Sequence, residues 1–91
     1  MYQLRYTPEA GRDIARLRKS GNKAVLKKLD VLLNELTEHP YSGTGHVERL
    51  KHYGEQTWSR RISDKHRLVY RVYEEVVLVL VLSAYGHYDD K

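Results

Sequence analysis

The stretch that decides the fold is WSRRISDKHRLVYRVY, residues 58–73. Apolar and polar side chains alternate along residues 58–63 and again along residues 66–73, with the turn-forming residues Ser63, Asp64 and Lys65 at the junction. Alternation with a period of two is typical of β-strands, and a tight turn between two such runs predicts a hairpin. We therefore expect the second half of the chain to form an antiparallel sheet.

Further strands are expected on both sides of this hairpin. Residues 76–84 are apolar at nearly every position, which is typical of a strand that is central in its sheet or covered on both faces. Residues 2–6 alternate and predict a short strand at the beginning of the chain. Residues 47–52 predict another short strand, followed by a turn at residues 53–56.

Two helices are expected between the first strand and the sheet. Thr7 is a suitable N-cap and Pro8 a suitable first helical residue, and Gly21 ends this helix. The second helix begins near Asn22 and ends before Pro40, and apolar residues spaced three and four apart form its buried stripe: Val25, Leu26, Leu29, Leu32, Leu33 and Leu36. The order is therefore α+β, with a helical hairpin on one face of a mostly antiparallel sheet that has three or four strands after the hairpin.

Length and composition narrow the class of protein. The 91 residues predict a single domain, residues 1–91. Cysteine is absent, which excludes disulfide scaffolds, cysteine-based zinc sites and thiol nucleophiles. The net charge of +4 fits a phosphate-rich partner or a basic protein without one. The longest apolar run, residues 76–82, is too short to span a membrane, and residues 1–10 lack a signal pattern, so a cytoplasmic location is expected.

The period of two also sorts the arginines. If Ile62 points into the core, Arg60 shares its side of the sheet, and three arginines share the face away from the helices: Arg61, Arg67 and Arg71. A guanidinium is a planar fork of donors that suits a phosphodiester. The alternative is a solvated basic face that is neutralised by nearby carboxylates: Glu48, Glu55 or Glu74.

Metal and cofactor chemistry fit the sequence poorly. His46 and His52 lie on either side of Glu48, but the spacing is not that of a His-Glu-x-x-His zinc site. The chain has no glycine-rich phosphate loop of the kinds that bind nucleotides. We therefore expect neither a metal nor a cofactor.

Four short motifs occur in order along the chain: LKH at residues 50–52, WSRRI at 58–62, HRLVY at 66–70 and GHY at 86–88. This set resembles the YoeB (Txe) toxins of bacterial toxin–antitoxin pairs, in the RelE superfamily. The resemblance implies a fold similar to microbial ribonucleases. It also implies a ribosome-dependent, metal-independent endoribonuclease that cuts mRNA in the ribosomal A site and so inhibits translation.

The resemblance also assigns roles to single residues. It implies a catalytic set of five: Glu48, Arg61, Arg67, His87 and Tyr88. In this set Glu48 is the general base and His87 the general acid. Three further cations are expected to bind the RNA: Lys51, Arg60 and Arg71. The chain departs from the family pattern at Arg49 and in the three residues that follow Tyr88.

Partners follow from the same resemblance. We expect an acidic cognate antitoxin of the YefM or Phd kind, together with the ribosome and mRNA, and a homodimer is a possible assembly. Two alternatives remain open. One is a non-catalytic toxin of the same superfamily, similar to the ParE toxins, which generally lack the Glu/Arg/His set. The other is a nucleic-acid-binding module that uses the basic face of the sheet.

Overall fold

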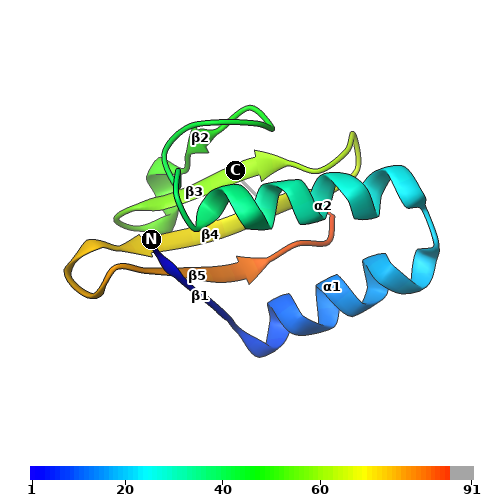
Figure 1. Ribbon diagram of the computed structural model, residues 1–91, viewed down its shortest axis with the longest axis horizontal. Coiled ribbons are helices and arrows are strands. Elements are labelled where there is room, and N and C mark those ends of the chain that lie inside the picture. The colour runs from blue at the N-terminus through cyan, green and yellow to red at the C-terminus, as the bar shows by residue number, and fades with distance from the viewer. Residues whose placement is uncertain (87–91) are drawn as a thin grey trace.

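The computed structural model describes residues 1–86 and has the expected α+β architecture (Figure 1). Strand β1 (Gln3–Tyr6) leads into helices α1 (Pro8–Ser20) and α2 (Lys23–Leu36). Four strands follow: β2 (Glu48–Arg49), β3 (Thr57–Arg61), β4 (Arg67–Tyr73) and β5 (Leu78–Ser83). Two short 3-10 turns, η1 (Lys51–Tyr53) and η2 (Glu74–Val76), lie between them.

The five strands form one sheet in the order β1-β5-β4-β3-β2. Strand β1 pairs with β5 in parallel, and the other neighbours are antiparallel. The strand predicted at residues 76–84 is confirmed over Leu78–Ser83, because β5 lies between β1 and β4 in the interior of the sheet. Val76 instead ends η2, and Val77 follows it in a left-handed conformation; both are exposed. Alternation along β5 then sends Val79 and Val81 to the core, where neither is exposed.

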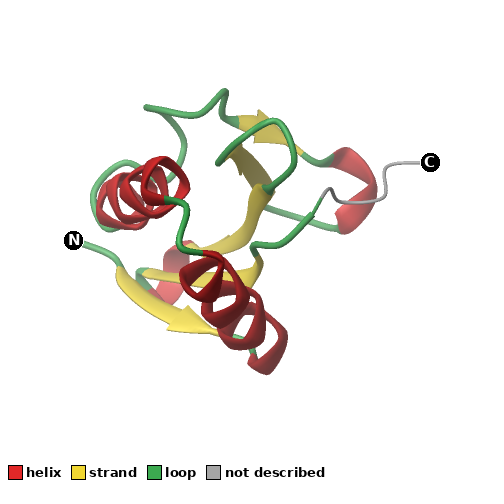
Figure 2. Ribbon diagram, turned by 90° about the vertical axis from the view of Figure 1, so that its right-hand side faces the viewer, coloured by secondary structure: helices red, strands yellow, loops and turns green. Residues whose placement is uncertain are grey.

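Both helices contribute to one core on one face of the sheet (Figure 2). The expected cap at Thr7 is present, because its hydroxyl accepts the Ala10 N–H at 3.0 Å. The Asn22 side chain caps the second helix by accepting the Val25 N–H at 3.1 Å. The buried faces of the two helices pack against the inward-facing side chains of β4 and β5. These side chains are Leu68, Tyr70, Val72, Val79 and Val81. The opposite, outer face carries Arg61 and the arginines of β4 together with Val69 and the leucines of β5.

The segment expected to be a strand at residues 47–52 is mostly not extended. Only Glu48 and Arg49 pair with β3, and residues 51–53 wind into η1. The reason is local, because Leu50 turns into the protein, where it is 5% exposed, and its N–H donates to the Thr57 carbonyl at 2.8 Å. One buried leucine therefore ends the strand and starts the turn.

Arg60 is the buried polar centre of the fold. Its side chain is completely buried, and its Nη1 donates to Glu35 Oε1 on α2 at 2.8 Å. Its Nη2 donates to the carbonyls of Ser42, at 2.8 Å, and His39, and its Nε donates to the Tyr70 hydroxyl at 3.1 Å. Because these donors are satisfied inside the protein, the expectation that Arg60 binds substrate is wrong.

The same ion pair fixes the loop that precedes β2. The backbone N–H and the hydroxyl of Thr44 donate to the Glu35 carboxylate at 2.8 and 2.6 Å, and with Arg60 they lower the pKa of Glu35. Gly45 has a φ of +94°, and a Cβ there would meet the Arg61 carbonyl oxygen at 3.0 Å. Only glycine suits this close approach of the two backbones. The approach places the residues that follow, which include β2, along the edge of β3.

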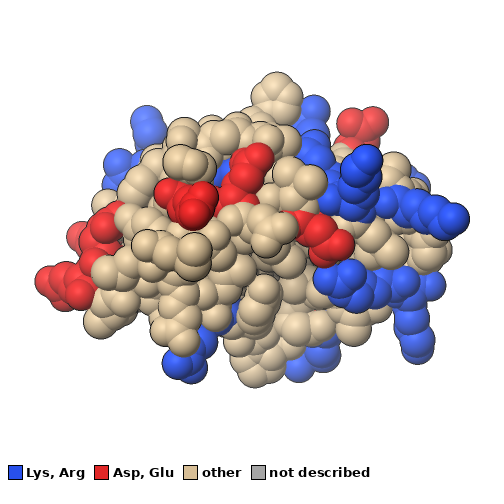
Figure 3. Space-filling model, in the orientation of Figure 1, with Lys and Arg blue, Asp and Glu red and all other residues tan. Residues whose placement is uncertain are grey.

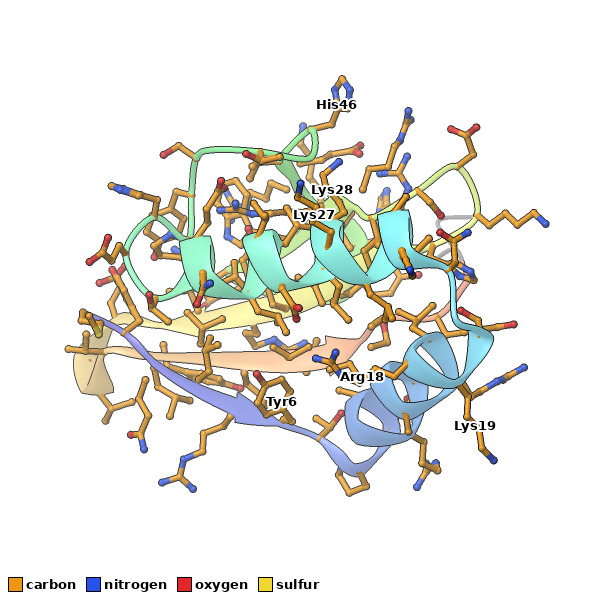
Figure 4. The ribbon with its side chains drawn as sticks, turned by 45° about the vertical axis from the view of Figure 1, so that its right-hand side comes forward. Tyr6, Arg18, Lys19, Lys27, Lys28 and His46 are labelled. Atoms are coloured by element: carbon orange, nitrogen blue, oxygen red, sulfur yellow. The ribbon has the colours of Figure 1, made fainter. Side chains whose placement is uncertain are left out.

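Positive charge gathers at the turn between the helices (Figure 3). Arg18 and Lys19 lie in the last turn of α1, and α2 begins with Lys23 and has no acidic residue in its first turn. Lys19 projects away from the sheet (Figure 4). Within residues 1–86, no helix combines the length and apolar character needed to cross a membrane.

Substituting Glu35→Ala is expected to lower the free energy of unfolding by about 3 kcal/mol. This is the lower end of the range for breaking a buried ion pair, and it applies because the Glu35 side chain is 27% exposed. The change leaves the buried Arg60 guanidinium without its anion. Urea unfolding of both proteins at pH 7 measures the difference.

The matched control is Glu38→Ala, an exposed carboxylate next to the same helix end, which is expected to change stability by less than about 0.5 kcal/mol. A lowered pKa stabilises the folded state above the ordinary value of 4.5, and this contribution is lost as the pH falls through the lowered value. The difference between wild type and Glu35→Ala should therefore shrink in acid. Equal losses for the two variants at pH 7 would contradict the account.

Candidate active site

The pairing of β2, β3 and β4 brings the predicted catalytic residues onto one face. Glu48 on β2 lies opposite Ser59 on β3, and Arg61 on β3 lies opposite Arg67 on β4. Because side chains alternate along a strand, the Arg60 side chain points toward α2 and the Arg61 side chain points away from the helices. Glu48, Arg61 and Arg67 therefore share the outer face of the sheet. Period-two alternation predicts this position for the two arginines, and the pairing of β2 with β3 adds Glu48.

The spacing of these residues follows from the register. Arg61 and Arg67 are direct cross-strand neighbours, a position in which Cβ atoms lie about 4.5–5.5 Å apart. Glu48 is the diagonal neighbour of Arg61, a separation of about 7–8 Å that long side chains can span. Glu48 is exposed and both arginines are half-buried. The Glu48 carboxylate and the guanidiniums of Arg61 and Arg67 therefore lie on the same face, one side-chain row apart along the strands.

Ser59 and Val69 form the floor between Glu48 and the two arginines. They are opposite each other on β3 and β4, and they are 0% and 3% exposed. Within residues 1–86, the Ser59 Oγ is the buried side-chain polar atom that has no hydrogen-bond partner. An unsatisfied buried hydroxyl is uncommon and marks this floor as a place to look for function.

Arg71 lies on the same face, one row further along. Its Nε donates to the Thr57 hydroxyl at 3.0 Å, and its Nη2 donates to the Tyr53 carbonyl at 3.0 Å. These bonds tie β4 to η1, the turn that carries Lys51. Arg71 also lines a hollow with Gly54 and neighbouring residues of the β2–β3 connection. Arg71 therefore stabilises the structure around η1 as well as lying on the face of the candidate site. Lys51 is exposed.

The C-terminal pair His87 and Tyr88 lies outside the described residues. The chain reaches the site at Gly86, the last described residue, whose carbonyl accepts the Arg67 N–H at 2.9 Å. Gly86 is therefore held at the start of β4, beside the cross-strand pair of Arg61 and Arg67.

The alternative in which Glu74 neutralises the arginines does not fit the structure. The Glu74 carboxylate accepts hydrogen bonds from the hydroxyls of Tyr41 and Tyr2, the latter at 2.8 and 3.0 Å, and these bonds lower the pKa of Glu74. Glu74 follows the far end of β4 and lies seven residues from Arg67, which at about 3.3 Å per residue is far beyond contact. Within residues 1–86, no group of three or more His, Asp or Glu side chains is arranged to hold a metal ion.

Sequence reasoning missed three parts of this region. Ser59 carries no periodic signal that distinguishes it from other strand residues. His66 belongs to the HRLVY motif, but the motif assigns it no role, and its contact with Gly86 appears only in three dimensions. Asp13, which accepts the Ala84 N–H at 3.0 Å, reads in the sequence as an ordinary polar residue of a helix.

Comparison with solved structures shows the class of fold. The YoeB/ParE toxin from Agrobacterium tumefaciens superimposes with a TM-score of 0.82 at 30% identity, covering 94% of this chain and 99% of that one. The YoeB dimer from Staphylococcus aureus gives a TM-score of 0.81 at 30% identity and covers 96% and 98%. The YoeB–YefM complex from Staphylococcus aureus gives 0.78 at 30% identity and covers 97% and 99%. The fold is that of small bacterial toxins.

Comparison of sequences identifies the family within that class. Residues 6–88 match the YoeB-like toxins of bacterial type II toxin–antitoxin systems. Toxin YoeB of Escherichia coli strain K12 is 40% identical over 58 residues, which cover 64% of this chain and 69% of that protein. Toxin RelK of Mycobacterium tuberculosis is 34% identical over 88 residues, 97% and 100% of the two chains. The chain belongs to the YoeB-like toxin family, as the motif resemblance predicts.

Replacing Arg61→Gln is expected to leave stability unchanged or to raise it by up to about 0.5 kcal/mol. Like charges directly opposite each other on a sheet are destabilising, and Arg61 lies opposite Arg67. The neighbouring Arg60→Gln, on the buried face, provides the control and is expected to cost about 3 kcal/mol or more. Urea unfolding measures both. A loss at Arg61 as large as the loss at Arg60 would show that Arg61 is structural.

Proposed function

We propose that the protein is a ribosome-dependent endoribonuclease that cuts mRNA in the ribosomal A site and thereby inhibits translation. The observation that carries the proposal is the shared outer face of Glu48, Arg61 and Arg67, which sequence motifs predict and strand register produces. Family membership supports it, because residues 6–88 match a family of toxins.

The proposed reaction is attack by an RNA 2′-hydroxyl on the adjacent 3′-phosphate. Glu48 accepts the hydroxyl proton as general base, and the new bond joins the 2′-oxygen to phosphorus. The bond from phosphorus to the 5′-oxygen breaks, and His87 gives that oxygen a proton while Tyr88 orients the RNA or His87. The products are a 2′,3′-cyclic phosphate and a 5′-hydroxyl, so no water is consumed in this step.

Arg61 and Arg67 are proposed to stabilise the charge that gathers on phosphorus during this step. Two adjacent guanidiniums repel each other in the free protein, so an anion between them relieves that repulsion as well as forming charge-assisted hydrogen bonds. Hydrogen-bond donors that are already in position before the reaction stabilise the charge of the transition state, and this is a large part of catalysis in many enzymes. Arg71 lies on the same face four residues further along β4, and Lys51 lies on η1. Both are proposed to bind the flanking RNA backbone.

The ribosome is proposed to supply alignment. On the outer face of this small protein, Glu48 is exposed and both arginines are half-buried. Correct placement of reacting groups accounts for a large share of such barriers, and an mRNA held in the A site is already extended and fixed.

The cellular control is proposed to be an acidic antitoxin. A solved relative is a YoeB–YefM complex, and another is a YoeB dimer, so both kinds of partner exist for close structural relatives. We propose that a YefM-like or Phd-like antitoxin covers the outer face near His87 and Tyr88, and that the toxin also forms a homodimer. A cytoplasmic site of action follows from the mRNA substrate.

Substituting Arg61→Ala or Arg67→Ala is expected to lower the single-turnover rate of cleavage of ribosome-bound mRNA by about 100-fold or more, the scale for losing one electrostatic stabiliser. The matched control is Arg18→Ala on α1, which is expected to leave the rate near that of wild type. Arg18 is exposed and pairs with Asp30 at 3.2 Å, on the helical side of the molecule. The rates are measured with purified ribosomes and a labelled message.

Equally mild effects at Arg18 and Arg67 would show that the arginine face is only a solvated surface. Growth arrest by the wild type without any mRNA cleavage would instead support a non-catalytic toxin of the superfamily. Binding of free nucleic acid with no growth arrest would support the alternative of a simple binding module.

A further inference from the structure

The chain that leaves β5 is held by a series of hydrogen bonds from α1. The Thr7 hydroxyl, at the start of that helix, donates to the Leu82 carbonyl at 2.9 Å. Two residues further along, the Ala84 N–H donates to Asp13 Oδ2 at 3.0 Å. A strand end that is only a loose terminus has no need of side-chain partners from a helix 71 residues away in the sequence.

Two more hydrogen bonds hold the next step of this path. The Gly86 N–H donates to the Nδ1 of His66 at 2.9 Å, and the Gly86 carbonyl accepts the Arg67 N–H at 2.9 Å. Both polar groups of Gly86 are thus bonded to consecutive residues at the start of β4. Arg67 is one of the arginines of the outer face, so the same backbone segment carries Arg67 and fixes Gly86.

A stack of three side chains covers this contact. The Tyr85 ring lies against the His66 ring with centroids 4.6 Å apart and planes inclined at 44°. The Arg16 guanidinium of α1 lies 3.8 Å from the centroid of the Tyr85 ring. Cations and aromatic rings attract each other in this geometry. We call the set of Arg16, His66, Tyr85 and Gly86 the C-terminal anchor.

The chemistry of the His66 contact is specific. A backbone N–H can only donate, so Nδ1 must carry a lone pair to accept from Gly86. The ring therefore acts as an acceptor at Nδ1 in this contact. Leucine at this position has no acceptor, whereas asparagine places its Oδ1 close to where Nδ1 stands.

Gly86 is needed for its backbone conformation and not for space. Its φ is +76°, and a Cβ there would meet nothing within 4 Å. A side chain is strained in the left-handed region, so alanine should weaken the anchor without disturbing any packed neighbour. This offers a second way to loosen the anchor that leaves His66 in place.

We propose that the C-terminal anchor fixes the backbone at Gly86, the residue before His87 and Tyr88, and that His66 is a positioning residue for RNA cleavage. The inference rests on the proposed function, because it acts through the residues that follow Gly86. Its physical basis is that reacting groups displaced by about 1 Å lose roughly 100-fold in rate. An anchor that acts on rate should leave binding to the programmed ribosome unchanged.

The test compares His66→Leu with His66→Asn in the full-length protein. Both variants lose the ring that packs on Tyr85, but only asparagine keeps an acceptor for the Gly86 N–H. We expect His66→Leu to lower kcat for ribosome-bound mRNA by about 10-fold or more with KM unchanged, and His66→Asn to recover most of that loss. Hydrogen exchange of the Gly86 amide should be fast in His66→Leu and slow in His66→Asn. Lys19→Ala, at the far end of α1, is the control.

Each result has a defined meaning. If His66→Leu cleaves as fast as wild type, or if both variants lose rate equally while the Gly86 amide stays protected, the inference is overturned. If His66→Leu does not fold, Gly86→Ala takes its place and is expected to show the same fall in kcat with KM unchanged. A wild-type protein that does not cleave mRNA overturns the proposed function, and the positioning role falls with it.

Discussion

Two consecutive arginines on β3 point in opposite directions, and much of the molecule depends on that alternation. Arg60 turns inward and is completely buried, where it joins β3 to Glu35 of α2 and to the loop that follows α2. Arg61 turns outward and lies opposite Arg67. A shift of one residue in the register of β3 would exchange these positions. The Arg61 side chain would then point into the core, and the pair of Arg61 and Arg67 would be lost from the outer face.

The buried arginine and the candidate site are therefore linked through the backbone. The contact between Glu35 and Thr44 fixes the loop that delivers Glu48 to the edge of β3, and the same Glu35 carboxylate neutralises Arg60. On the far side of the hairpin, Arg67 holds Gly86 through its N–H. The interior ion pair stabilises the scaffold, while the outer face carries like charges that are unfavourable in the free protein and useful toward a phosphate. Stability and proposed activity are thus assigned to opposite faces of the same strand.

Periodicity predicted the features that depend on a repeating pattern. The cap at Thr7 follows from residue type, and the α+β order and the outward position of Arg61 and Arg67 follow from spacing; the structure confirms all three. The role of Arg60 was mistaken because a period of two places a residue on a face but does not reveal its partner, and Glu35 lies 25 residues earlier. The early end of β2 and the contact of His66 with Gly86 depend on single tertiary contacts, which leave no periodic trace. The predicted roles of Glu48, His87 and Tyr88 rest on family resemblance and remain predictions.

The central claim is that the outer face of β2, β3 and β4 cleaves RNA by using the RNA's own 2′-hydroxyl. The most direct test places a single 2′-deoxynucleotide in the message on the 5′ side of the mapped cleavage position, in mRNA bound to purified ribosomes with the protein present. The account predicts that the message with the 2′-hydroxyl is cut to a 2′,3′-cyclic phosphate and a 5′-hydroxyl, and that the deoxy-substituted message stays intact while still occupying the ribosome. Cleavage of both messages at the same rate would contradict it.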